Sequence, residues 1–285
     1  MKTVLVSALL SLLTLTAVQA QSQTEKTSKT GSFQNTQNVR VLSLANISGF
    51  VKIEGYNGNQ VMLESEKTVT AKNQAEVTKG MQEVQLKLLE AGDSIYVYLE
   101  APFIKRSKHR GHGLNMNTED INYDFKYDLT LKVPFKIDLD VSTVNDGDVT
   151  VANLTGNLKV RNVNGGVFLT NITGSTQATT VNGPVEVSFA QAPAADSQFK
   201  TINGELKVFY PAKLDATVSF KSMNGQFYTD LKDLELQPVK VTRNTGNNGS
   251  NTVYKLDKSQ TYKAGQGGIA LTFETLNGNI YLKKK

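Results

Sequence analysis

The chain has 285 residues, enough for one large domain or a smaller pair. It has no cysteine, which excludes disulfides, thiol nucleophiles and cysteine-ligated metals. Its formal net charge of +5 is mild and spread along the sequence, which argues against a nucleic-acid-binding protein.

The N-terminal residues 1–20 are typical of a secretory signal. Lys2 precedes an apolar run from Val4 to Val18, and a cleavage site with small residues ends at Ala20. The run is short and interrupted by Ser and Thr, which disfavours a membrane anchor. No other stretch of the sequence is long and apolar enough to cross a bilayer. We therefore predict an exported protein, periplasmic, cell-surface or extracellular, with no transmembrane segment after signal cleavage.

Residues 21–38 are polar, and we expect a flexible leader here. Residues 39–134 predict an N-terminal antiparallel β portion, because apolar residues alternate in several short runs. Two of these runs flank an Ala-Gly-Asp turn and indicate a hairpin. Residues 71–80 are the one segment compatible with a short helix. A basic loop, residues 105–120, interrupts this portion before a strand that stops at Pro134.

Residues 135–285 repeat one pattern, an apolar residue followed by Asn and Gly, at intervals of 18 to 21 residues. Apolar residues alternate on both sides of each pair, which indicates strands with one buried face. The alternation changes parity at the Asn-Gly pair, so the chain must bend there to keep its apolar side inward. Because Asn and Gly tolerate φ > 0, we expect tight structural corners at these positions. The predicted corner residues are Asn145, Asn164, Gly165, Asn182, Gly183, Asn203, Gly204, Asn224, Gly225, Asn277 and Gly278.

A second pattern, Asn-x-Thr/Ser-Gly, lies between these corners at residues 153–156 and 171–174, with a further copy at 46–49. Each period therefore holds two short strands and two corners. A polar insertion at 235–268 interrupts the repeats. The sequence predicts an all-β fold, a single-stranded β-helix or solenoid that follows the N-terminal antiparallel portion. The alternative is a β-meander or sandwich in which each Asn-Gly pair is a hairpin turn.

Candidate chemistry is sparse. The two histidines, His109 and His112, lie in the basic loop, and any catalytic triad or histidine metal site would depend on them. Four carboxylates cluster at Asp138, Asp140, Asp146 and Asp148, but later repeats do not build an acidic column on them. We interpret Asp138 and Asp140 as solvated charges on an outer strand face. Apart from the histidines as metal candidates, we predict no catalytic residue, cofactor or metal site.

The sequence also resembles a known family. The signal segment, the strand ending Leu131-Lys132-Val133-Pro134, the run Thr143–Val151 and the chained Thr-Val-Asn-Gly copies carry the resemblance. It is to exported β-strand-repeat proteins of unknown function that are labelled "putative adhesin", including the head-GIN type, and it covers residues 39–282. The resemblance implies a single-stranded β-helix outside the cell envelope and supplies no catalytic residues.

The sequence leaves two functional hypotheses open. The first is a non-enzymatic, adhesin-like protein or scaffold of the cell envelope that binds glycan, lipid or protein, with a surface glycan or envelope protein as partner and no nucleic acid. Evenly spaced outward side chains are candidates for contacting a repeating ligand: Lys159, Arg161, Glu186, Lys207 and Lys221. The alternative is a polysaccharide-active β-helix enzyme, a lyase or hydrolase, which needs paired carboxylates or a Ca²⁺ and base cluster. Such an enzyme would be supported by one groove that gathers Asp140, Asp148, Arg161 and a histidine.

Overall fold

The structure, a computed structural model, describes most of the chain and is nearly all-β, as the sequence predicts. The described residues are 20–34, 39–106, 114–116, 121–193, 195–211, 213–239, 241–245, 252–256 and 259–285. All but the last residue of the predicted signal lie outside these ranges, as do residues 35–38.

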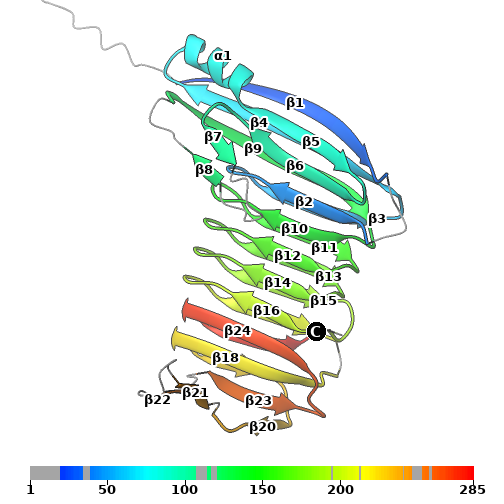
Figure 1. Cartoon of the computed structure of the whole chain (residues 1–285), viewed down its shortest axis with the longest axis vertical. Coiled ribbons are helices and arrows are strands. Elements are labelled where there is room, and N and C mark those ends of the chain that lie inside the picture. The colour runs from blue at the N-terminus through cyan, green and yellow to red at the C-terminus, as the bar shows by residue number, and fades with distance from the viewer. Residues whose placement is uncertain are drawn as a thin grey trace, which may run out of the picture.

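Two long sheets, here called sheet A and sheet B, contain most of the strands (Figure 1). In spatial order sheet A consists of β1 (Gln21–Ser32), β4 (Gln60–Ala71), β9 (Tyr123–Pro134), β3 (Val51–Tyr56), β11 (Val149–Leu154), β13 (Val167–Ile172), β15 (Val185–Phe189), β17 (Leu206–Tyr210), β25 (Ile280–Lys284) and β19 (Phe227–Thr229). Sheet B consists of β20 (Leu234–Leu236), β23 (Gln260–Ala264), β18 (Ala216–Asn224), β24 (Ile269–Asn277), β16 (Ser197–Lys200), β14 (Thr176–Thr179), β12 (Leu158–Arg161), β10 (Asp138–Ser142), β2 (Val41–Ala45), β6 (Ser94–Glu100) and β5 (Gln85–Ala91).

The remaining elements are one helix and two small hairpins. The helix is α1 (Gln74–Glu83), close to the segment expected from the sequence, and its N-cap Asn73 accepts a hydrogen bond from the backbone N–H of Glu76. The hairpins are β7 (Ile104–Arg106) with β8 (Leu114–Met116), and β21 (Val241–Thr245) with β22 (Thr252–Leu256). The predicted hairpin in the N-terminal portion is β5 and β6, which pair antiparallel.

The repeats form a solenoid. Each coil contributes one strand to sheet B, turns at an Asn-Gly corner, and contributes the next strand to sheet A. Successive coils pair parallel and in register, so that Val149 lies beside Val167 and Val167 beside Val185. The β-meander alternative is therefore wrong for the repeats, because consecutive hairpins would run antiparallel.

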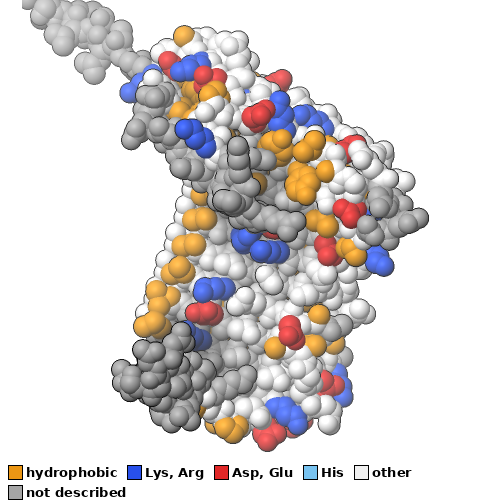
Figure 2. Space-filling model, in the orientation of Figure 1, with side chains coloured by type: hydrophobic (Ala, Val, Ile, Leu, Met, Phe, Trp, Pro, Cys, Tyr) orange, Lys and Arg blue, Asp and Glu red, His pale blue; other side chains and the backbone are white. Residues whose placement is uncertain are grey.

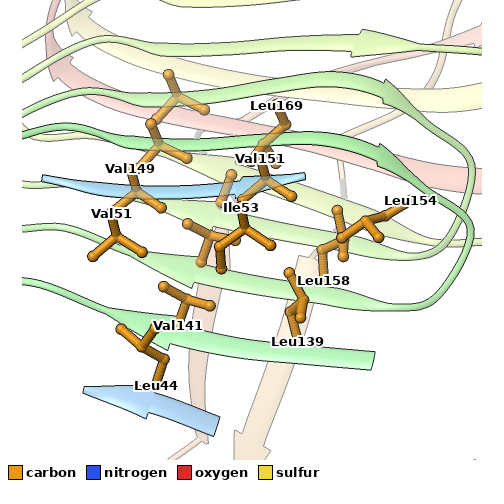
Figure 3. Packing of buried hydrophobic residues seen from close by; sticks show 14 of the residues in the cluster. Leu44, Val51, Ile53, Leu139, Val141, Val149, Val151, Leu154, Leu158 and Leu169 are labelled. Atoms are coloured by element: carbon orange, nitrogen blue, oxygen red, sulfur yellow. The ribbon is translucent and has the colours of Figure 1, made fainter. Parts of the chain in front are cut away.

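The core lies between the two sheets and consists of stacked aliphatic columns (Figure 3). Val51 and Val149 occupy one column of sheet A, and Ile53, Val151 and Leu169 occupy the next. All five side chains are essentially inaccessible to solvent. Each such side chain stabilises the fold by about 1.5–3 kcal/mol relative to an exposed one, so the alternating pattern of the sequence accounts for the two-sheet stack.

The solenoid begins earlier than the predicted boundary at residue 135. Strands β2 and β3 form its first coil in chain order, since β2 pairs parallel with β10 and β3 pairs parallel with β11. On their other side β2 pairs parallel with β6 and β3 with β9, so the N-terminal portion expected to be antiparallel is partly parallel. In this coil Ser48 bridges to Asn145, which places Asn46 in the column of Thr143. The segment 46–49 is therefore an Asn-Gly-type corner, and its assignment to the Asn-x-Thr/Ser-Gly pattern was wrong. The side-chain amide of Asn46 accounts for this different role, because it is buried and donates a hydrogen bond to the backbone carbonyl of Tyr127 (2.9 Å).

The expected flexible leader is largely a strand. Residues Gln21–Ser32 form β1, which pairs antiparallel with β4 over its whole length. Nearly all of β1 is exposed, so no apolar alternation marks it in the sequence. Backbone pairing and contacts such as Thr27 Oγ1 to Ser65 Oγ (2.7 Å) hold it in place.

The C-terminal repeat is inserted out of chain order. Strand β24 lies between β16 and β18, and β25 lies between β17 and β19. The last Asn-Gly corner, at Asn277, accordingly bridges to Asn203. The coils at this end therefore do not stack in sequence order, and β25, the last strand of the chain, lies inside sheet A and not at its edge.

The predicted polar insertion, 235–268, contains more structure than expected. Its described part includes most of β20, which pairs antiparallel with β23. Strand β23 in turn pairs antiparallel with β18 and extends sheet B. The insertion therefore covers one end of the stack.

Candidate binding surface

The Asn residues of the corners form a continuous hydrogen-bonded ladder along the stack. Each side-chain amide donates to the amide oxygen of the neighbouring coil at 2.7–2.9 Å. The spatial order of the ladder is Asn145, Asn164, Asn182, Asn203, Asn277 and Asn224. All six side chains are exposed, so the ladder lies on the surface of the corner.

A second, buried polar column lies just inside this ladder. Thr180, two residues before Asn182, donates to the carbonyl of Gly165 in the adjacent coil (2.7 Å), and Thr201 donates in the same way to Gly183 (2.9 Å). Thr143, Asn162, Ser222 and Thr275 make equivalent bonds to glycine carbonyls. These bonds satisfy polar groups inside the corner, where an unpaired group would destabilise the fold.

The positive φ expected at the Asn-Gly corners occurs at some of the glycines, +155° at Gly165, +159° at Gly183 and +158° at Gly278, and not at their asparagines. Among the described residues other than glycine, positive φ occurs at Asp146, Asn153 and Asn171, and not at the Asn of the Asn-Gly pairs. The side chains of those Asn residues instead form the hydrogen-bonded ladder between coils. The glycines allow close backbone approach, because a Cβ on Gly183 would lie 2.3 Å from the carbonyl oxygen of Gly165.

Replacing Asn182 with alanine is expected to lower the free energy of unfolding by about 1–2 kcal/mol, since it removes two ladder hydrogen bonds. Asn145 stands at the end of the ladder and has one ladder partner, Asn164. Asn145→Ala should therefore lower the free energy of unfolding by about half as much as Asn182→Ala. Urea denaturation of both variants measures the difference, and equal losses would contradict the ladder assignment.

A column of apolar side chains runs beside the Asn ladder. It consists of the residue that precedes each Asn. Val144, Val163 and Val181 are half-buried, whereas the exposed fraction is 37% at Ile202, 38% at Leu276 and 71% at Met223. Hydrophobic side chains line one long edge of the stack in Figure 2. The corner edge is thus partly apolar, whereas the strand faces between the corners are mostly polar.

The outward charges singled out in the sequence lie on opposite faces. Lys159, Arg161 and Lys221 belong to sheet B, and Glu186 and Lys207 belong to sheet A. A single ligand cannot contact all five. On sheet A, Lys207 binds Glu205 (2.7 Å), and this hydrogen bond raises the pKa of Lys207. Lys207 also lies 5.7 Å from the ring centroid of Tyr281.

Three carboxylates of the cluster noted in the sequence, Asp138, Asp140 and Asp148, have structural partners. Asp140 forms an ion pair with Arg161 (2.5 Å) on sheet B. Asp148 lies at a corner and accepts from the backbone N–H of Gly166 (2.7 Å). Asp138 accepts from the backbone N–H of Asn157 (2.7 Å). Of the residues that the enzyme hypothesis requires in one groove, Asp140 and Arg161 are therefore in contact, whereas Asp148 accepts a hydrogen bond at a corner.

The structure does not describe the two histidines that the sequence offers as candidate metal ligands. His109 and His112 lie outside the described residues. Within the described ranges, no group of three or more His, Cys, Asp or Glu residues is arranged to hold a metal ion. The same part of the chain contains no helix long and apolar enough to cross a membrane.

The outer face of sheet B has a hollow of about 330 Å³ near the inserted coil, here called the sheet B hollow. Its lining residues come from β18, β23, β24 and the residue before β23. They are Thr217, Ser219, Lys221, Ser259, Thr261, Ala270, Thr272, Phe273 and Glu274. Hydroxyl groups dominate the lining, and such groups can donate to and accept from the hydroxyls of a sugar.

One carboxylate of the hollow binds two lysines. Glu274 accepts from Lys200 at 3.2 Å and lies 3.4 Å from Lys221. Burial raises the pKa of Glu274, but the hydrogen bonds and charges of the two lysines outweigh it and hold the pKa below its ordinary value. Glu274 is therefore ionised at neutral pH, and the three groups together carry one net positive charge.

Sequence reasoning identified Lys221 but missed the rest of the hollow. In the outward column of Asp140, Lys159, Gln177 and Gln198, the last two repeats carry Thr272 and Ser219, and this change to hydroxyl side chains was the available signal. Ser219 and Thr272 are 53 positions apart in sequence, and they become neighbours only through the insertion of β24 beside β18.

A family model described as Toastrack DUF4097 matches residues 106–280, more than half of the chain. No curated protein matches. Among solved structures, the chain is similar to a "putative cell adhesion protein" from Clostridium sporogenes, with 13% identity, a TM-score of 0.42 and coverage of 92% of this chain and 100% of that one. It is also similar to a "putative adhesin" from Bacteroides fragilis (10%, TM-score 0.39, coverage 92% and 97%). A "putative lipid binding protein" from Parabacteroides distasonis shows 10% identity, a TM-score of 0.24 and coverage of 91% and 96%.

Proposed function

The chain belongs to the Toastrack DUF4097 family, and from that premise we propose that it is an exported, non-enzymatic, adhesin-like scaffold of the cell envelope that binds a surface glycan. Its residues 1–20 direct export, and the two-sheet stack forms the rigid body that carries the binding face. The glycan is the partner, and neither a cofactor nor nucleic acid takes part.

The observation that carries this proposal is the regular polar face of sheet B. Parallel coils repeat at the ~4.8 Å spacing of neighbouring strands, so outward side chains stand in columns. Asp140, Lys159, Gln177 and Gln198 follow one another in one such column. A column of evenly spaced donors and acceptors suits a linear polymer, whose own hydroxyls recur at regular intervals.

The chemistry of the face favours a glycan over a lipid. The sheet B hollow is lined by hydroxyls and charged groups, with Ala270 and Phe273 as its apolar members. Lipid chains need an apolar lining, because burying polar groups without partners is costly. The enzyme alternative has less support, since Asp140 and Asp148 are engaged by Arg161 and by a corner amide.

The test is binding of purified residues 21–285 to a panel of immobilised surface polysaccharides, anionic phospholipid vesicles and envelope proteins. We expect retention on at least one polysaccharide and release by the same free polymer. The polymer should be recovered uncut, as judged by its size distribution after prolonged incubation. Retention on vesicles or proteins alone, or shortening of the polymer, would contradict the proposal.

A further inference from the structure

Uncharged polar side chains form the floor of the sheet B hollow, and their row continues beyond the hollow to Gln198 on the neighbouring strand. Gln198 of β16 lies opposite Thr272 of β24, Thr272 opposite Ser219 of β18, and Ser219 opposite Thr261 of β23. The hydroxyls of Ser219 and Thr261 are 3.4 Å apart. Because all four side chains point to the outer face, they form a row of donors and acceptors at strand spacing.

A charged row borders this floor on the same face. Lys200 lies opposite Glu274, and Glu274 lies opposite Lys221. The side chains of Lys200 and Lys221 are 42% and 45% exposed, so both ammonium groups reach solvent. One carboxylate between two ammonium groups leaves each lysine with N–H groups that can bind a second anion.

The dimensions limit what can occupy the hollow. A volume of about 330 Å³ is at the lower end of the range of about 300–1,000 Å³ found for small-molecule sites. A sugar unit of a polymer fits such a space, and the rest of the polymer can continue along the open face of sheet B. A hydrocarbon chain would leave the hydroxyls of the floor without partners.

We propose that the sheet B hollow binds a carboxylated sugar unit of an acidic polysaccharide. The hydroxyl row of Thr272, Ser219 and Thr261 receives the sugar hydroxyls, and the ammonium groups of Lys200 and Lys221 bind the sugar carboxylate. In this arrangement Glu274 orients the two lysines and competes with the ligand for them. This assignment rests on the proposed glycan-binding function and adds the site and the ligand class.

The role proposed for Glu274 predicts whether each substitution raises or lowers the binding affinity. Lys221→Gln removes one charged donor and should weaken binding about tenfold. Glu274→Gln removes the competing carboxylate and should strengthen binding by about threefold or more. A residue that merely supports the fold would weaken binding when replaced. Lys52→Gln is the matched control, because Lys52 is an exposed lysine on β3 of sheet A, away from the proposed binding face.

The experiment measures binding of full-length mature protein to sodium polygalacturonate, with dextran as the neutral polymer, by isothermal titration calorimetry at low and high salt. We expect binding to polygalacturonate that weakens with salt, no binding to dextran, and unchanged affinity for Lys52→Gln. Circular dichroism melting checks each variant. If Glu274→Gln is not folded, Lys200→Gln and Thr272→Val, both expected to weaken binding, decide the matter.

Three results would overturn the assignment, and they are distinguishable. If the wild type binds polygalacturonate but the hollow variants bind as it does, the site is wrong while glycan binding stands. If dextran binds as tightly, or if Glu274→Gln weakens binding, the acidic ligand class is wrong. If the wild type is retained by no polysaccharide at all, the proposed function itself fails together with this assignment.

Discussion

Replacing Gly204 with alanine is expected to lower the free energy of unfolding by about 3–5 kcal/mol, at the upper end of what single substitutions cost. The added Cβ would lie 2.0 Å from the carbonyl oxygen of Gly183 and 2.5 Å from its carbonyl carbon. Both atoms are backbone, so they cannot rotate away as a side chain can. The coils would have to separate at this corner, which would also weaken the bond from Thr201 to the Gly183 carbonyl.

A matched control is Gly92→Ala. Gly92 has a φ of +66°, and a Cβ there would meet no atom within 4 Å. Alanine should therefore cost only the strain of left-handed backbone, about 1 kcal/mol. Chemical denaturation of both variants separates the two effects. Equal losses at Gly204 and Gly92 would contradict the prediction, because they would leave no additional cost for the close approach of neighbouring coils at Gly204.

The same close approach recurs along the stack. A Cβ on Gly165, Gly183, Gly225 or Gly278 would also lie within 2.3 Å of a glycine carbonyl oxygen in the adjacent coil. The sequence located these corners because their spacing is regular. It did not show why Gly204 and Gly225, which lack positive φ, must also be glycine, because a single sequence does not show which backbone atoms of neighbouring coils meet.

Sequence patterns predicted the solenoid well and its ends poorly. Alternation around each Asn-Gly pair requires a two-faced strand, and this pattern extends to Val51 and Ile53 in the first coil. Strand β1 carries no such alternation, because its side chains are exposed and its stability comes from backbone pairing with β4. A polar strand of this kind cannot be told from a flexible leader by composition.

The order of the last coils was also beyond the sequence. Phe199, Phe220 and Phe273 occupy the same position of their repeats, so each could follow either of the others in a stack. The structure places Phe273 between the other two. The candidate site depends on this order, because the hollow forms only where Thr272 lies beside Ser219.

Deleting residues 269–285 is therefore expected to unfold the C-terminal coils, although the deletion is at the end of the chain. The segment contributes β24 and β25, which separate β16 from β18 and β17 from β19. It buries four large apolar side chains, Leu271, Phe273, Ile280 and Leu282. Their burial stabilises the fold by about 6–12 kcal/mol in gross terms. That is comparable with the whole stability of a typical domain, about 5–15 kcal/mol.

The damage should be local, because coils of a solenoid contact mainly their neighbours. Limited proteolysis of the truncated protein should cut the chain after Tyr210, where β17 ends, and leave the preceding coils intact. A matched control replaces Val241–Leu256 with a Gly-Ser linker; the two strands of this segment pair with each other and with neither long sheet. The control should melt as the wild type does. If the truncated protein instead resists protease as far as β19, the coil of β18 and β19 has closed directly onto β16 and β17, and the inserted coil is not required for their order.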